Sequence, residues 1–232
     1  MTTAATNQEF NGDIDDVLVY SRVLAQPEIQ ALVQQPNKRI FVTAINYGGD
    51  LRTIVSGAPT GTGIAGADAK CNADTNIPNT SNYKAMIIDG NIRRACTTGN
   101  CVGTAPLSGL IEQKDWVLQP NVTYIRPDAL TPTLMLSVFT ADWNGVWNFG
   151  GTAPTGGSLS NAISGPVIND NIWTGLDGAW LLSTFGNCTG WSDSTPAVSG
   201  DDAGANSIGA SAISWSGGSS CNIPQRLYCV EQ

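Results

Sequence analysis

Six cysteines and the adjacent aspartates Asp201 and Asp202 are the residues of this chain that we consider first for chemistry. The chain contains no histidine, which excludes a catalytic triad, a histidine general base and a histidine-based zinc site. An even number of cysteines with no CxxC pair favours disulfide bonds over zinc ligation, and therefore predicts an oxidising compartment. Six cysteines allow many pairings, and spacing alone suggests only a local loop closure between Cys96 and Cys101.

Asp201 and Asp202 are the candidates for acid–base catalysis, because paired carboxylates can divide that work between them. They lie next to each other in a Gly- and Ala-rich stretch. Adjacent carboxylates without a supporting motif are usually solvated, and we expect the same here. The sequence therefore predicts that the protein is not an enzyme, with no cofactor and no metal site.

The charge distribution disfavours polyanionic partners. The 232 residues carry a formal net charge of −8, and after Arg126 the only basic residue is Arg226. A phosphate-binding surface needs clustered Lys and Arg, so we expect no nucleic-acid or heparin-like partner. No stretch approaches the roughly 20 apolar residues that a membrane helix requires, so we expect no membrane span.

The elements that must position these residues are short strands joined by many turns, as 26 glycines and 12 prolines indicate. We expect a helix over 64–72 that carries Cys71, and long loops over 128–170. Strands are expected at 40–44, 83–88, 122–125, 172–176 and 226–230. Residues 194–220 are rich in Gly, Ser and Ala, but Ile208, Ile213 and Trp215 favour an ordered loop.

The first 36 residues read as separate from the rest. Residues 1–7 are polar and are interpreted as the start of the expressed chain or a linker, without the apolar core of a signal peptide. Residues 8–33 resemble the last strand and helix of laminin-G-like, concanavalin-type jelly-roll domains. We interpret 8–36 as the C-terminal fragment of such a domain and 37–232 as the main domain. The expectation is a piece of a longer protein whose signal and any lipid anchor are absent from this chain.

The main domain resembles a bacterial family called domain of unknown function 1554. The strings that carry the resemblance are RIFVTAINYGGDL, GIAGADAKCNAD, YKAMIIDG, RRAC, IWTGL, NCTGW and RLYCVEQ. Members are surface proteins and lipoproteins of leptospires and legionellae, some described as endostatin-like. The resemblance implies an α+β, C-type-lectin-like fold with long Gly-, Ser- and Thr-rich loops. It also implies the disulfide pairs Cys71–Cys229, Cys188–Cys221 and Cys96–Cys101.

This chain departs from common members in two places. Residues 50–62 form an insertion, and the segment Ala179-Trp180-Leu181-Leu182 is unusually apolar. Gln119-Pro120-Asn121 looks like the calcium-binding motif of sugar-binding C-type lectins, but it precedes the Trp173-Thr174-Gly175-Leu176 strand, whereas the lectin motif follows it. We therefore expect a turn at 119–121.

Function is expected to lie in recognition outside the cell or on its outer surface, through the loops of residues 177–220. The resemblance implies a protein ligand such as a host extracellular-matrix or complement-regulatory protein, with carbohydrate as the less favoured ligand. Trp180 and Trp215 either anchor a binding face or pack under the loops. The candidate face consists of Asp177, Ala179, Trp180, Leu181, Leu182, Thr184, Ser192, Ser194, Ile208, Ser211, Ser214 and Trp215.

Two other functions remain open. One is a hypervariable ligand-binding protein diversified by a retroelement, which would require a near-copy of the codons for about residues 172–232 beside a reverse-transcriptase gene. The other is a structural subunit of a surface fibre or particle, which would self-assemble.

Overall fold

The computed structural model describes residues 21–23, 36–103, 111–151, 156–165, 171–215 and 217–232. The chain divides into two compact units, residues 1–34 and 35–232. The second unit contains every helix and strand of the described residues, and strands predominate there beside two α-helices, so the predicted α+β class is confirmed. The jelly-roll fragment predicted at 8–36 lies almost entirely outside the described residues.

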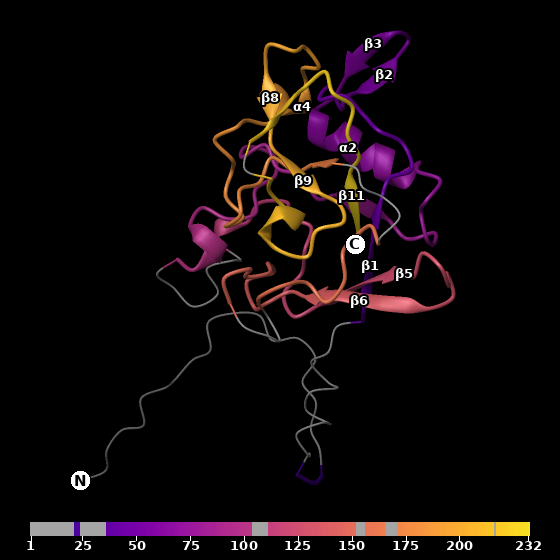
Figure 1. Ribbon diagram of the computed structural model, residues 1–232, viewed down its shortest axis with the longest axis vertical. Helices are drawn as coiled ribbons and strands as arrows, with labels where there is room; N and C mark the ends of the chain where they lie inside the picture. Colours follow the sequence, from indigo (N-terminus) through magenta and orange to yellow (C-terminus); the bar gives the residue numbers. More distant parts are fainter. Residues whose placement is uncertain (1–20, 24–35, 104–110, 152–155, 166–170, 216) are drawn as a thin grey trace, which may run out of the picture. The chain divides into compact units, whose positions relative to one another are not determined.

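A five-stranded sheet forms the base of the second unit (Figure 1). Its first and last strands in sequence lie side by side and antiparallel, with Phe41 opposite Cys229. The outer strands pair antiparallel, and only the contact of β1 with β5 is parallel. In spatial order the strands are β4 (Tyr83–Ala85), β11 (Tyr228–Glu231), β1 (Lys38–Val42), β5 (Thr123–Pro127) and β6 (Met135–Thr140).

Helix α2 (Gly63–Asn72) begins where Thr62 accepts a hydrogen bond from the Ala65 N–H on its side chain. Small residues on its inner face let it approach the preceding segment closely. A Cβ on Gly66 would lie 2.0 Å from the carbonyl oxygen of Leu51, which only glycine tolerates. The helix predicted at 64–72 is therefore confirmed.

The remaining elements are short. The pairs β7 (Asn171–Trp173) with β9 (Asp202–Gly204) and β8 (Ser199–Gly200) with β10 (Ser219–Ser220) order the C-terminal loops. Helix α4 (Cys188–Trp191) and the 3-10 turns η1 (Gly99–Cys101) and η2 (Ala210–Ala212) complete the described elements of the loop region. The predicted insertion at 50–62 contains an exposed hairpin of β2 (Thr53–Val55) and β3 (Ala58–Thr60).

One predicted loop is wrong. Residues 128–170 were expected to be long loops, but β6 lies within them and pairs with β5. Phe139 of β6 packs against Tyr124 of β5, with ring centroids 5.1 Å apart. Burial of these aromatic rings explains why the segment is a strand despite its Thr- and Pro-rich flanks.

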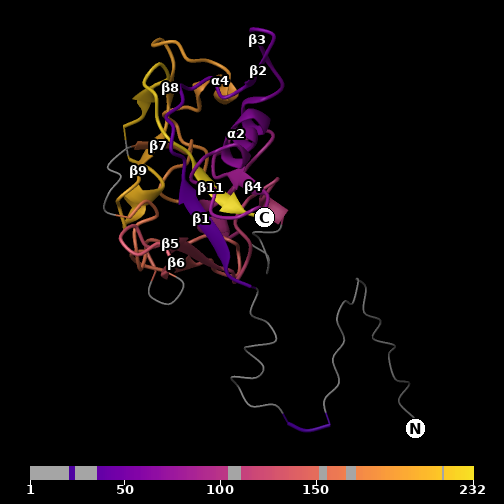
Figure 2. The ribbon, with the colours of Figure 1, turned by 90° about the vertical axis from the view of Figure 1, so that its right-hand side faces the viewer.

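Three disulfides join these elements, in the pairs that the family resemblance implies. Cys71 of α2 is bonded to Cys229 of β11, 158 residues later. Cys188 of α4 is bonded to Cys221, and Cys96 to Cys101. The first bond fixes α2 to the five-stranded sheet, and the second closes the C-terminal loops. In both ribbon views α2 lies beside β11 (Figures 1 and 2).

Aromatic side chains fill the core. Trp173 and Trp191 are fully buried, with ring centroids 5.8 Å apart, and Phe41, Tyr83 and Tyr228 are buried as well. Among the described residues, no helix is long and apolar enough to cross a membrane.

Candidate functional site

The candidate face divides into exposed and covered residues. Leu182, Thr184, Ser194, Ile208 and Trp215 are exposed, and Trp215 retains 54% of its surface. A second group is half-buried: Asp177, Ala179, Leu181, Ser192, Ser211 and Ser214.

Trp180 is not on the surface, which corrects its place in the candidate face. Its exposed fraction is 1%, and its Nε1 donates to the carbonyl oxygen of Trp147 at 2.7 Å. The ring lies against Trp116 and Phe149. The reason is a turn in which the Asp177 carboxylate accepts from two backbone N–H groups and directs the tryptophan inward.

The structure also separates Ser192 and Ser194 from the rest of the face. An isolated antiparallel β-bridge joins the backbones of Ser192 and Asp50. The Ser192 carbonyl oxygen also accepts a hydrogen bond from the Arg52 guanidinium at 2.9 Å. A Cβ on Gly48 would lie 3.3 Å from Ser194 Cβ. Figure 1 shows α4 beside the β2–β3 hairpin, so these two serines belong to that end of the unit.

Asp201 brings two of the predicted loops together. Its Oδ2 accepts from the hydroxyl of Ser183 and, at 3.4 Å, from that of Ser214. The backbone of Asp201 accepts from Thr174 and Gly175 and donates to Gly186 at 3.0 Å. The loop after β7 and the loop before β10 therefore converge on one buried side chain.

The expectation that Asp201 and Asp202 are solvated is wrong. Their exposed fractions are 0% and 3%. Asp202 accepts on Oδ2 from Asn171 at 2.9 Å and from Ser219 at 2.6 Å. Within the described part of the chain, Oδ1 of Asp201 has no donor. Both carboxylates thus hold the loops from beneath, where a surface ligand would not contact them.

Asp201→Asn is expected to remove a pH-dependent loss of stability. Burial raises the pKa of Asp201, so the folded state holds this proton more tightly than the unfolded state. The stabilising contribution is present below the unfolded pKa of about 3.9 and is lost as the pH rises through the folded pKa. The difference in melting temperature, variant minus wild type, should therefore increase by roughly a few degrees between about pH 4 and pH 7.

Thermal unfolding followed by tryptophan fluorescence across that pH range measures this difference. Asp193→Asn, which removes one carboxylate from another loop, controls for the change in net charge. A difference between Asp201→Asn and the wild type that stays constant with pH would contradict the assignment.

Phe185 belongs to this surface although the sequence did not single it out. Its exposed fraction is 43%, and a Cβ on Gly218 would lie 2.8 Å from Phe185 Cβ. It follows Ser183 by two residues, so it lies where the two loops converge on Asp201. Its signal in the sequence was weak, because a lone Phe between Thr and Gly fits a core position equally well. We call the exposed residues Leu182, Thr184, Phe185 and Trp215 the loop face.

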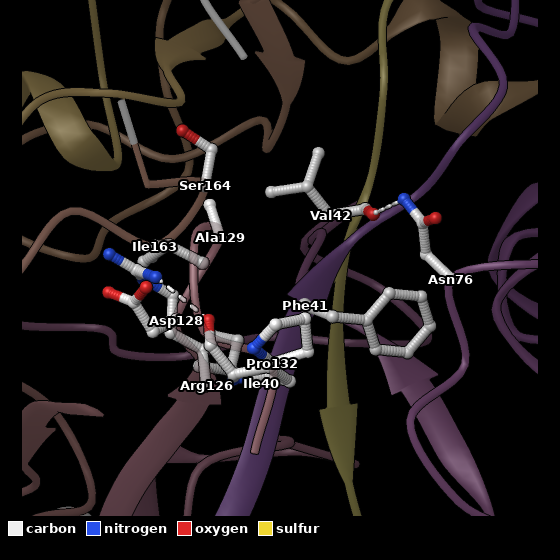
Figure 3. A pocket seen from close by; sticks show the side chains of 11 residues that line it. Ile40, Phe41, Val42, Asn76, Arg126, Asp128, Ala129, Pro132, Ile163 and Ser164 are labelled. Atoms are coloured by element: carbon white, nitrogen blue, oxygen red, sulfur yellow. Dashed lines mark hydrogen bonds between the residues drawn. The ribbon is translucent and has the colours of Figure 1, made fainter. Parts of the chain in front are cut away.

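A cavity of about 360 Å³ lies elsewhere, between β1, β5 and the segment around Ser164 (Figure 3). Asn76 donates to the Val42 carbonyl oxygen on one wall, and Arg126 donates to that of Pro127 on the other. Arg126 is 6% exposed and also donates to the Ala162 carbonyl oxygen at 2.6 Å. None of the residues predicted from the sequence as candidate face lines this cavity.

The lectin-like tripeptide forms a turn, as expected. The Val122 N–H donates to the Gln119 carbonyl oxygen at 3.4 Å, and Asn121 has a positive φ of 59°. The turn connects to β5.

A family model described as "Protein of unknown function (DUF1554)" matches residues 54–208, well over half of the chain. Comparison with curated proteins gives no match.

Proposed function

The chain belongs to the DUF1554 family, and on that premise we propose that it is an extracellular recognition module that binds a protein ligand through the loop face. The observation that carries the proposal is Trp215, a half-exposed tryptophan on a loop fixed from beneath. Tryptophans of this kind dominate the binding energy of protein interfaces, because a large ring leaves water at little entropic cost.

The fold proposed for the unit is C-type-lectin-like. Its support is the disulfide from α2 to the last strand, the antiparallel contact of β1 with β11, and an inner disulfide that closes the C-terminal loops. In such an arrangement the sheet and the long crosslink supply stability, and the loops can vary without unfolding the domain.

The loop face is apolar and neutral. Leu182, Phe185 and Trp215 expose 42%, 43% and 54% of their surfaces. Removing apolar surface from water contributes about 25 cal/mol per Å², so each of these side chains can contribute to binding when a partner covers it. A protein surface with complementary apolar residues suits this face better than a charged polymer does.

The loops are preorganised for binding. The Trp215 N–H donates to the Asp202 carbonyl oxygen at 2.6 Å, and the ring covers Gly204, where a Cβ would lie 2.7 Å from it. The bond between Cys188 and Cys221 restrains the same loops. A surface that is already ordered loses less conformational entropy when it binds.

Location outside the cell or on its outer surface is part of the proposal. All six cysteines are in disulfides, and such bonds persist in oxidising compartments. The family resemblance suggests an adhesin-like role for the chain. Extracellular-matrix and complement-regulatory proteins are therefore the first ligands to test.

Trp215→Ala is expected to weaken ligand binding at least tenfold, about 1.4 kcal/mol. The wild-type chain would be measured by biolayer interferometry against bacterially expressed, unglycosylated fragments of matrix proteins and complement regulators. Because the Trp215 ring is half-exposed, its loss should change the free energy of unfolding by less than about 1 kcal/mol.

Trp143→Ala is the matched control, since it removes a similarly exposed tryptophan, at 47%, from another loop. Equal losses in both variants, or full affinity in Trp215→Ala, would rule out the loop face as the protein-binding surface.

A further inference from the structure

A second pocket, of about 240 Å³, lies beside η1, and none of the four loop-face residues lines it. Its lining is polar apart from two exposed side chains, Trp143 and Val102, which expose 47% and 64% of their surfaces. The polar lining comes from Asn100, Asp142, Asn144 and Asn148. Pockets for drug-sized ligands span about 300–1,000 Å³, so this one suits a single small ring.

The loop that carries Trp143 is rigid. The Asp142 Oδ1 accepts from the N–H groups of Asn144 at 2.8 Å and Val146 at 3.2 Å. The Trp116 Nε1 donates to the Gly145 carbonyl oxygen at 2.9 Å, and Gly145 has a φ of 69° that favours glycine. The backbone that carries the exposed indole is therefore ordered, and Trp143 lines the pocket.

The pocket contains polar atoms that still need partners. Asn100 Oδ1 is buried, and no donor reaches it from the residues that the structure describes. A buried oxygen without a donor costs free energy, which a ligand hydroxyl that reaches it recovers. Within the described residues, the two hydrogen bonds to the Asp142 carboxylate go to Oδ1, so Oδ2 can accept from a ligand. Asn148 accepts from Gly150 on Oδ1, and its amide N–H groups can donate.

Gly156 packs closely against two other residues that line the pocket, Asn148 and Gly151. A Cβ on Gly156 would lie 2.7 Å from the Asn148 carbonyl oxygen and 2.8 Å from the Gly151 Cα. Glycine at 156 therefore allows the backbone of this segment to fold closely beside Asn148. The close packing places the Asn148 amide in the wall of the pocket.

We propose that this pocket binds one neutral pyranose ring without calcium, stacked on Trp143. A pyranose presents C–H groups on its faces and hydroxyls at its edge. The partly positive C–H groups suit the negative face of an indole. Each hydroxyl both donates and accepts, which matches the acceptors of Asp142 and Asn100 and the donors of Asn148.

Charge restricts the sugar class. Neither Lys nor Arg lines the pocket among the described residues, and Asp142 contributes a carboxylate. An acidic sugar would place its own carboxylate near that charge and lose affinity. The inference is independent of the proposed function, because the protein ligand is assigned to the loop face and the sugar to a pocket on another loop.

The test uses the full chain and the methyl glycosides of glucose, galactose, mannose and N-acetylglucosamine. Saturation-transfer-difference NMR titrations in the presence of EDTA give the affinities, with methyl glucuronide as the acidic comparison. We expect at least one neutral glycoside to bind and the glucuronide to bind more weakly. Trp143→Ala should weaken binding at least about tenfold, Trp143→Tyr should restore most of it, and Trp215→Ala should leave it unchanged.

Three results would overturn the proposal. The first is that none of the neutral glycosides binds, and the second is that Trp143→Ala retains full affinity. The third is binding that requires added calcium, which would make the oxygen-rich wall an ion site. Near-ultraviolet circular dichroism of each variant shows that the surrounding aromatic core is intact, and Asn148→Ala provides a second loss-of-binding variant within the same pocket.

Discussion

Replacement of both Cys71 and Cys229 by alanine is expected to lower the free energy of unfolding by about 5 kcal/mol. The bond joins α2 to β11 across 158 residues, so its absence lets the unfolded chain explore many more conformations. In the chain-entropy description, stabilisation grows with the logarithm of the closed loop. Marginal domains are stable by only about 5–15 kcal/mol, so this double variant should be close to unfolding at 37 °C.

The other two disulfides supply the matched controls. The Cys188–Cys221 bond closes 33 residues and should contribute about 4 kcal/mol, and the Cys96–Cys101 bond closes 5 and should contribute about 2 kcal/mol. Guanidinium unfolding of the three double-alanine variants, followed by tryptophan fluorescence, measures the order. If loss of Cys96–Cys101 costs as much as loss of Cys71–Cys229, loop closure is not the source of the stability.

Arg93→Met should cost about 3–5 kcal/mol, because it leaves two carboxylates without their buried cation. Arg93 is fully buried. Its guanidinium donates to both carboxylate oxygens of Asp68, at 2.9 Å and 2.8 Å, and to Asp115 at 2.6 Å. It also donates to the Ala85 carbonyl oxygen at 2.8 Å. One side chain thus links α2, β4 and the segment before β5.

Arg52→Met is the control for Arg93→Met. Arg52 donates to Asp50 at 2.7 Å, but the two side chains are 27% and 22% exposed. Pairs that water can reach contribute about 0–1 kcal/mol. Urea unfolding at neutral pH should therefore separate the two variants by at least about 2 kcal/mol. Equal losses would show that the Arg93 cluster is no stronger than a surface pair.

Local sequence patterns were sufficient to predict helix α2 and two strands of the five-stranded sheet. The small apolar residues around Cys71 predicted α2 to within one residue at its start, and the apolar runs at 40–44 and 226–230 predicted β1 and β11. These elements bury their own patterns against the core, so the local pattern and the final structure agree. The α+β class followed from them.

Burial of Asp201, Asp202 and Trp180 could not be predicted in this way. The hydroxyl and amide groups that satisfy the two aspartates come from residues 13 to 31 positions away, such as Ser214 and Asn171. Trp180 turns inward because Trp116 and Phe149, distant in sequence, complete its environment. Both results depend on tertiary contacts that composition and spacing do not encode.

The sugar pocket shows the same limit. The sequence pattern does not distinguish Trp143 from Trp147, which lie in the same predicted loop, yet Trp147 is 3% exposed and Trp143 is 47% exposed. Only the turn at Asp142 and its contact with Trp116 decide which ring faces the solvent.

The antiparallel contact between β1 and β11 determines how the unit responds to mechanical tension. The start of β1 and the end of β11 lie together, where the Arg39 N–H donates to Glu231 at 2.7 Å. A pulling force between these ends opens the strands pair by pair, a geometry with low resistance. Opening proceeds past Ile40 and Val230 and then reaches Cys229. From there the bond to Cys71 carries the load covalently, so the residues enclosed between Cys71 and Cys229 are not pulled directly.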